Sequence, residues 1–212
     1  TRKESSAASD VYKRQIQWIQ SLGVSSEGVQ AWRAGRLISA FCYPQAPLSA
    51  FCKDLANNPV PTLLLIPKGI ASDIPSGQQD NLHVARIPFT TQPEYDQTLW
   101  TADLNIVRGE DSFVRALWAA KPAIWHIYPQ TEDTHLVKLD AWLARTALPA
   151  PAQSCIRGWN LDHAAAERPN AFDQVLESAS FAAWAAAAKD IAADLAKNHD
   201  LAGALDLSLI HI

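Results

Sequence analysis

Short apolar runs alternate along this chain with segments in which apolar residues recur every three or four positions. The run at 61–66 is continuously apolar and flanked by prolines, a pattern typical of a strand buried on both faces of a parallel sheet. By contrast, Leu48, Phe51 and Leu55 have the spacing of one buried helix face, which predicts a helix at 48–57. The same criteria predict further strands at 36–43, 82–87, 104–107 and 123–128, and further helices at 93–100, 110–120, 134–147, 172–180 and 181–205.

Strands that alternate with helices in this way predict an α/β fold, with a Rossmann-like, mostly parallel sheet flanked by helices. Two stretches fit neither pattern. Residues 16–34 mix apolar and polar positions and are expected to form a linker and a helical piece, whereas 67–81, rich in Pro, Gly, Ser and Asp, is expected to be a loop. The alanine-rich helix near 181–198 either covers one sheet face or crosses to another domain, which would leave its apolar face exposed here.

The two ends of the chain differ from the rest. There is no methionine, residues 1–15 are polar without an apolar period, and both VYKRQ and the closing LSLIHI resemble translated adapter or vector sequence. We therefore expect 1–15 and 207–212 to be non-native tails, the alternatives being a disordered native tail and a short native strand. The folded domain is expected to span 16–206 and to be part of a longer protein.

Composition and charge exclude several classes of protein. The net charge is −4, with 22 acidic and 18 basic residues, so no general attraction to nucleic acid or to an anionic membrane is expected. The 3 cysteines form no CxxC pair, which favours a reducing compartment. No apolar run approaches the roughly 20 residues that cross a bilayer. We therefore expect a soluble cytoplasmic protein.

The stretch 107–118 has the strongest chemical signal. An apolar strand ends at Val107, Gly109 permits a tight turn, and a helix then starts with acidic residues and Ser112. The free amides and the dipole of a helix start bind anions without a metal, and Arg108 beside them can neutralise a diphosphate. The alternative is an ordinary capped helix with a surface arginine, and the spacing alone slightly favours that alternative.

Apolar residues of the same helix are expected to form its buried face. The predicted pairs are Phe113 with Leu117 and Val114 with Trp118. Among the 8 tryptophans, Trp100, Trp118 and Trp142 lie on apolar helix faces and are expected in the core rather than on a partner surface.

Aromatic residues follow the preceding strand. Phe89 and Tyr95 are placed to sandwich a base, and Gln92 offers both a donor and an acceptor to its polar edge. The alternative is that these aromatics, like Phe41 and Tyr43 after the first strand, are core or half-buried loop residues. Neither a metal site nor a cofactor motif is expected, because His126 and His135 have no third ligand at a suitable spacing.

The segment RGEDSFVRALWAAKPAIWHIYPQ at 108–130 resembles a block of the bacterial glycosyltransferases that add rhamnose to an arginine of translation elongation factor P. The IPF-x-x-Q-x-x-Y-D-x-x-LW segment after 87 and FCY at 41–43 also resemble that family, at the expected spacing. The resemblance covers most of 16–206. It implies two facing Rossmann-like domains, the GT-B arrangement, of which this chain is the C-terminal, donor-binding half.

The resemblance also implies a set of roles. The donor is dTDP-β-L-rhamnose, and elongation factor P is the acceptor, held by the missing N-terminal half. Two aspartates of that half supply further carboxylates, so this chain alone is expected to bind the donor without transferring the sugar. The carried-over positions are Phe89 and Gln92 for thymine, Tyr95 as a pocket aromatic that many relatives replace by Phe, Arg108, Asp111 and Ser112 for the diphosphate, Glu110 as a carboxylate needed for activity, and Tyr43 and Phe41 as further contacts.

Two other hypotheses remain open. The chain is either the donor half of another GT-B glycosyltransferase or a non-catalytic nucleotide-binding or interaction domain rich in tryptophan. Preference among dTDP, UDP and GDP separates these possibilities.

Overall fold

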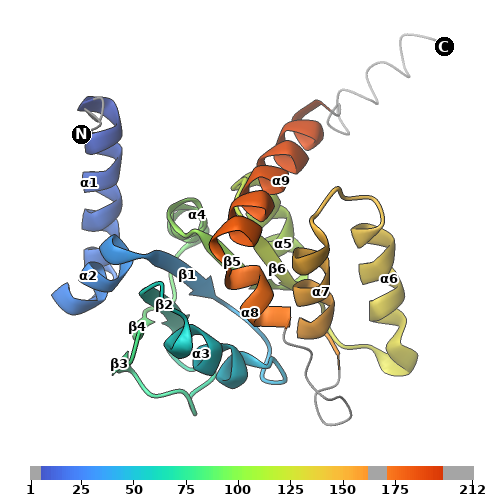
Figure 1. Cartoon of the computed structure of the whole chain (residues 1–212), viewed down its shortest axis with the longest axis horizontal. Coiled ribbons are helices and arrows are strands. Elements are labelled where there is room, and N and C mark those ends of the chain that lie inside the picture. Colours follow the sequence, from blue (N-terminus) through green and yellow to red (C-terminus); the bar gives the residue numbers. More distant parts are fainter. Residues whose placement is uncertain (1–5, 162–170, 198–212) are drawn as a thin grey trace.

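Six strands form one sheet at the centre of the molecule (Figure 1). The computed structural model describes residues 6–161 and 171–197 of the chain. The strands are β1 (Arg36–Ala40), β2 (Thr62–Pro67), β3 (Gly77–Gln79), β4 (Leu82–Ile87), β5 (Leu104–Arg108) and β6 (Ala123–His126). Their order is β3-β4-β2-β1-β5-β6, and only the short β3 runs antiparallel to its neighbour. The predicted α/β class with a Rossmann-like, mostly parallel sheet is confirmed.

Helices flank the sheet on both sides (Figure 1). They are α1 (Ser6–Ser21), α2 (Ser26–Ala34), α3 (Leu48–Asn57), α4 (Gln92–Thr101), α5 (Gly109–Trp118), α6 (Thr134–Leu143), α7 (Ala150–Trp159), α8 (Ala171–Leu176) and α9 (Ser178–Lys197), with a 3-10 turn, η1, at Thr131–Asp133. Helix α3 has the predicted bounds. Strand β3 lies inside the predicted loop. The sequence analysis does not predict α7, because two prolines stand at its start. Proline is tolerated there, since the first backbone amides of a helix have no acceptor within the helix.

Helix α1 includes residues 6–15, which the sequence pattern assigns to a tail outside the folded domain. The division of the chain at residues 15 and 16 stays a prediction. The second proposed tail, 207–212, lies outside the described residues.

The two faces of the sheet belong to separate hydrophobic clusters. Alternate residues of one strand point to opposite faces, so Leu63 and Leu65 of β2 pack with Trp32 of α2, whereas Leu64 and Ile66 pack in the cluster of α3, α7 and α9. All four leucine and isoleucine side chains are fully buried, which is why the sequence of β2 is continuously apolar.

The long C-terminal helix α9 takes part in the second cluster. It contacts α5, α7 and α8, and it buries Trp184, Ala188 and Ala192. At least this side of the alanine-rich helix therefore covers the core of the domain.

Three residues predicted to be buried are exposed instead. Trp100, Val114 and Trp118 are 55%, 50% and 54% exposed. Helix α5 turns Phe113 and Ala116 inward, so Val114 and Trp118, which lie on the opposite side of the helix, face solvent. Trp142 is half-buried and packs edge-on against Phe113, with ring centroids 5.0 Å apart.

The order of the strands reverses between β1 and β5. From β1 the chain passes outward through β2 to β4, and it then returns to place β5 on the other side of β1. The connections therefore leave the carboxyl ends of β1 and β5 in opposite directions. Such a point leaves an open crevice, which is where ligands bind in sheets of this kind.

A close approach of two backbone segments at Gly35 gives a test of the fold. This residue joins α2 to β1, and a Cβ added there would lie 1.9 Å from the carbonyl oxygen of Pro61. We expect Gly35→Ala to lower the free energy of unfolding by about 2 kcal/mol or more, because backbone must move to make room. Urea denaturation measures the change.

Gly158 in α7 is the matched control for this substitution, because a Cβ there meets nothing within 4 Å. Alanine at 158 should leave the unfolding free energy unchanged or raise it by about 0.5 kcal/mol. An equal effect at both positions would contradict the packing of β1 beside Pro61.

Candidate functional site

A pocket opens at the carboxyl edge of the sheet, beside the strand reversal. It lies between the ends of β1, β2 and β4 and the first turns of α4 and α5. The lining residues are Ser39, Phe41, Pro67, Ile87, Pro88, Phe89, Thr90, Gln92, Tyr95, Thr98, Asp111, Ser112 and Arg115. Five predicted site residues therefore share one pocket, together with Phe41, while Tyr43, Arg108 and Glu110 lie outside its lining. The functional roles of all of them stay predictions.

The turn between β5 and α5 has the geometry expected of an anion site. Gly109 has φ +67°, a left-handed conformation that favours glycine. Its carbonyl oxygen accepts a 2.9 Å hydrogen bond from Nε1 of the buried Trp125. The turn is thereby fixed, and the first amides of α5, which have no acceptor within a helix, lie at the sheet edge.

The start of α4 is fixed by its own side chains. The Glu94 carboxylate accepts hydrogen bonds from the Thr91 amide and the Thr91 hydroxyl, both at 2.8 Å. This cap sets where the helix begins. It thereby places Gln92 and Tyr95, both in the first turns of α4, on the wall of the pocket.

Aromatic rings and one guanidinium line the end of β1. The ring of Phe41 meets those of Phe89 and Tyr95 edge-on, each with centroids 6.2 Å apart. The guanidinium carbon of Arg108 lies 4.1 Å from the Phe41 ring centroid and 5.1 Å from that of Tyr43. Arg108 thus stacks beside the pocket, where a cation over an aromatic face is attracted to it.

Phe89 and Tyr95 differ in exposure. Phe89 is 64% exposed, so it is a free aromatic face and not the core residue of the alternative interpretation. The Tyr95 hydroxyl is buried, and burial raises its pKa to about 12, so it stays protonated near neutral pH. Ser112 lies near enough to oppose this increase in pKa, but no hydrogen bond of normal geometry joins the two side chains.

Tyr43 does not line the pocket and packs against the end of β6 instead. Its amide donates a 3.2 Å hydrogen bond to Nδ1 of His126, and its ring packs edge-on against His126 and Tyr128. Together with Arg108 it extends the aromatic edge from β1 toward β6.

Glu110, the predicted functional carboxylate, is exposed and ion-paired. Lys138 of α6 donates a 2.9 Å hydrogen bond to its Oε1. That bond is the main reason why the pKa of Glu110 lies below its ordinary value. The carboxylate therefore stays ionised to lower pH than a free glutamate.

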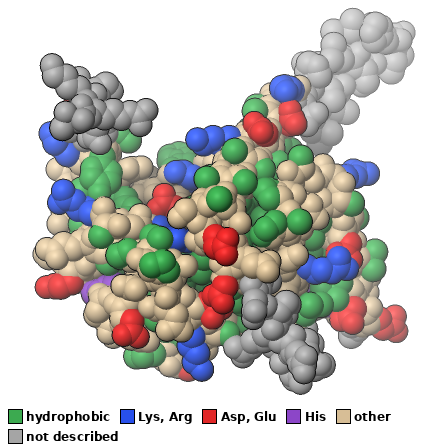
Figure 2. Space-filling model, in the orientation of Figure 1, with side chains coloured by type: hydrophobic (Ala, Val, Ile, Leu, Met, Phe, Trp, Pro, Cys, Tyr) green, Lys and Arg blue, Asp and Glu red, His purple; other side chains and the backbone are tan. Residues whose placement is uncertain are grey.

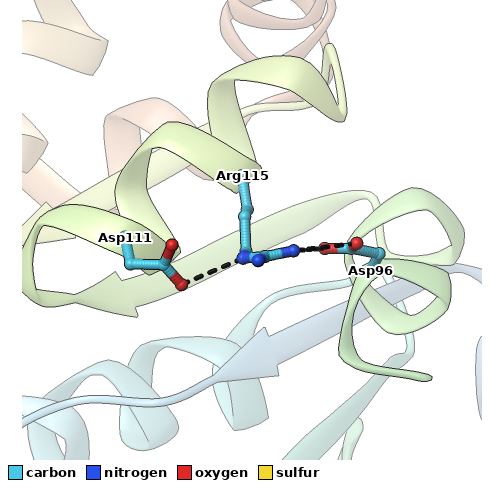
Figure 3. Close-up of polar contacts among 3 residues, drawn as sticks. All are labelled: Asp96, Asp111 and Arg115. Atoms are coloured by element: carbon cyan, nitrogen blue, oxygen red, sulfur yellow. Dashed lines mark hydrogen bonds and ion pairs between the residues drawn. The ribbon is translucent and has the colours of Figure 1, made fainter. Parts of the chain in front are cut away.

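Arg115 is a charged residue of the pocket that the sequence analysis does not identify. Arg115 of α5 donates to both oxygens of Asp96 on α4, at 3.1 and 3.0 Å, and its Nε donates to Asp111 at 2.9 Å (Figure 3). The hydrogen bond to Asp111 is the main reason why the pKa of Arg115 lies above its ordinary value, and the hydrogen bond to Asp96 is the second. The available signal was the four-residue spacing of Asp111 and Arg115 on one helix.

Among residues 6–161 and 171–197, no three His, Cys, Asp or Glu side chains lie close enough together to hold a metal ion. Within the same ranges, no helix has the length and apolar character needed to cross a membrane. Acidic and basic side chains are interspersed on the face shown in Figure 2, so that face has no large field of one sign.

Comparisons with known proteins identify the family to which the chain belongs. The family described as "Elongation-Factor P (EF-P) rhamnosyltransferase EarP" matches residues 2–208. The curated protein-arginine rhamnosyltransferase of Pseudomonas aeruginosa is 42% identical over 142 residues, which are 61% of this chain and 38% of that protein. Its counterpart in Shewanella oneidensis is 40% identical over 146 residues, or 60% of this chain and 36% of that protein.

One solved structure has the same fold over nearly the whole chain. It is described as "Structural basis for EarP-mediated arginine glycosylation of translation elongation factor EF-P" and has a TM-score of 0.72 at 30% identity, covering 94% of this chain and 66% of the other. Against the two curated relatives, the chain spans less than two fifths of their length. This agrees with the expectation that the chain corresponds to one part of such a protein.

The ion pair at Glu110 gives a test of the site's electrostatics. We expect Lys138→Met to raise the pKa of Glu110 toward the ordinary value of about 4.3, since the bond that favours its charged form is lost. As the pH falls below neutral, the Glu110 carboxylate of the variant will then take up its proton at a higher pH than that of the parent chain. An NMR titration of the side-chain carboxyl carbons follows this.

Glu94 serves as the internal control in the same spectra. Its pKa is also lowered, but by the Thr91 backbone amide, so it should not respond to the substitution. An unchanged Glu110 titration in Lys138→Met would show that the pair does not form in solution.

Proposed function

Because the chain belongs to the EarP family of elongation factor P rhamnosyltransferases, we propose that it is the donor-binding part of such an enzyme. The complete protein is an inverting glycosyltransferase of the GT-B arrangement. It transfers rhamnose from dTDP-β-L-rhamnose to an arginine side chain of elongation factor P in the cytoplasm. This chain corresponds to its C-terminal half.

The observation that most supports the proposal is that two chemically different surfaces line one pocket. One surface is aromatic and amide-bearing, from Phe89, Gln92 and Tyr95, and the other is the N-terminal turn of α5 at Asp111 and Ser112. A nucleoside diphosphate has the same two parts, a flat base and a charged phosphate chain. The pocket therefore matches the ligand class from both ends.

The base end suits thymine. Thymine has an N–H donor between two carbonyl acceptors, and a glutamine amide offers both a donor and an acceptor to such an edge. The exposed ring of Phe89 provides a face on which the base stacks, while Phe41 and Tyr95 close the wall behind it.

The phosphate end relies on the main chain. The first amides of α5 and the positive end of its dipole point at the diphosphate, and Arg108 adds a guanidinium from the end of β5. As the sugar leaves, negative charge grows on the departing diphosphate, and these fixed donors stabilise it. No metal is required for this role.

The acceptor is a poor nucleophile, because a guanidinium stays protonated near neutral pH. One of its nitrogens must bond to the anomeric carbon while the carbon–oxygen bond to the diphosphate breaks and dTDP departs with the electron pair. The nitrogen then gives its proton to a carboxylate. Glu110, kept ionised by Lys138 next to the diphosphate site, is one carboxylate suited to orient the guanidinium.

The remaining acceptor-side groups belong to the part of the protein outside this chain. The chain spans 38% of the length of its Pseudomonas aeruginosa relative, which leaves room for a second domain that holds elongation factor P. The chain alone therefore binds the donor without completing the transfer.

Nucleotide preference tests the donor site. We expect dTDP to bind more tightly than UDP or GDP by isothermal titration calorimetry, and Phe89→Ala and Gln92→Ala each to weaken dTDP binding about tenfold or more, because each removes a contact to the base.

Val137→Ala is the control, since Val137 is 69% exposed on α6 and does not line the pocket. It should leave dTDP binding unchanged. Tighter binding of UDP or GDP would point to a glycosyltransferase with another donor, and binding of none of the three would favour an interaction domain.

The incompleteness of the chain is tested separately. Incubated with elongation factor P and dTDP-β-L-rhamnose, it should give no deoxyhexose adduct on the acceptor, as followed by intact-protein mass spectrometry. A measurable adduct would show that every catalytic group lies within these residues.

A further inference from the structure

Arg115 holds together the two helices that form the pocket. It is the i+4 partner of Asp111 on α5, and it reaches across to Asp96, which follows Tyr95 on α4 (Figure 3). Its Nη1 atom donates to both carboxylate oxygens of Asp96 and its Nε donates to Asp111, so carboxylates of both helices hold the guanidinium.

The charges of this cluster bear directly on anion binding. Among the described residues that line the pocket, the charged side chains are Asp111 and Arg115. The Arg115 and Asp96 side chains are only 27% and 25% exposed, so their attraction is screened less than that of a surface pair, whereas Asp111 is 70% exposed. Two carboxylates and one guanidinium leave a single negative charge beside the first turn of α5.

We propose that Arg115 is a positioning residue of the donor site, which keeps Asp111 turned along α5 and neutralises one of the two carboxylates, Asp96 and Asp111, of the cluster that borders the pocket. Without its guanidinium, two negative charges would face a ligand that is itself strongly anionic. The effect acts on the phosphate end of the pocket and not on the base. The inference rests on the proposed nucleotide-sugar site and adds a residue whose role neither the sequence pattern nor the comparisons assign.

A plain structural role predicts a different outcome. If Arg115 served only to keep α4 packed on α5, its loss would displace Gln92 and Tyr95 and weaken binding of the base as much as that of the phosphates. Thymidine, which has the base without phosphates, therefore separates the two roles when it is compared with dTDP.

The test measures binding of dTDP and of thymidine to the parent chain and to Arg115→Met by isothermal titration calorimetry. We expect the dissociation constant for dTDP to rise about tenfold, a size typical of a lost charge-assisted contact. The constant for thymidine should change less than about twofold. Equal weakening of both ligands, or a change in dTDP binding below about twofold, would overturn the proposal.

Two further variants keep the test decisive if Arg115→Met is poorly folded. Adding Asp96→Asn to Arg115→Met returns the cluster to its original net charge, and it should restore dTDP binding to within about threefold of the parent. Arg115→Lys keeps the charge without the fork and should weaken dTDP binding by an intermediate amount. A double variant that binds dTDP no better than Arg115→Met would overturn the electrostatic role.

Arg157→Met is the matched control. Arg157 of α7 also bridges two helices through an aspartate, Asp140 of α6, at 2.6 Å, but it lies outside the pocket. Its loss should leave both dissociation constants unchanged. Failure of the parent chain to bind dTDP would overturn the proposed function together with this inference, whereas normal binding by the parent and by Arg115→Met would overturn the inference alone.

Discussion

The site depends on the reversal of strand order between β1 and β5. Because the chain leaves these neighbouring strands in opposite directions, a crevice forms at their carboxyl ends, and the pocket lies beside it. Two helices begin beside this opening. Helix α4 starts with residues suited to a base, and α5 starts at Gly109, whose left-handed backbone turns the chain sharply from strand into helix. The pocket lies between these two helix starts.

Electrostatics explains how the proposed anion site can contain acidic residues. Glu110 and Asp111 occupy the first turn of α5, where negative side chains stabilise a helix but also repel a phosphate. Each is ion-paired with a cation from outside that turn, Glu110 with Lys138 and Asp111 with Arg115. The two acidic residues can therefore stabilise the start of the helix without making the pocket strongly negative. Glu110 is in addition available for the proposed chemistry. Arg108 lies next to them over the aromatic end of β1.

The sequence predicts the fold better than it predicts exposure and side-chain pairing. Continuous apolar strands and helical spacing are local signals, so β2, β4 and α3 were placed within a residue or so. The resemblance of the segments after 87 and at 108–130 predicts five residues that share the pocket. Trp118 was misplaced because an apolar side chain at helical spacing does not reveal which face the sheet covers. Arg115 was missed because its partner Asp96 lies on another helix, and that pairing arises only when α4 and α5 pack together.

The proposed donor site requires that the first amides of α5 bind a nucleotide diphosphate. The most direct test is the change in amide NMR signals of an isotopically labelled chain on addition of dTDP, compared with thymidine. We expect the amide signals of residues 110–112 to shift with dTDP and not with thymidine, while Gln92 responds to both ligands. Shifts confined to another part of the surface, or the same response of residues 110–112 to both ligands, would contradict it.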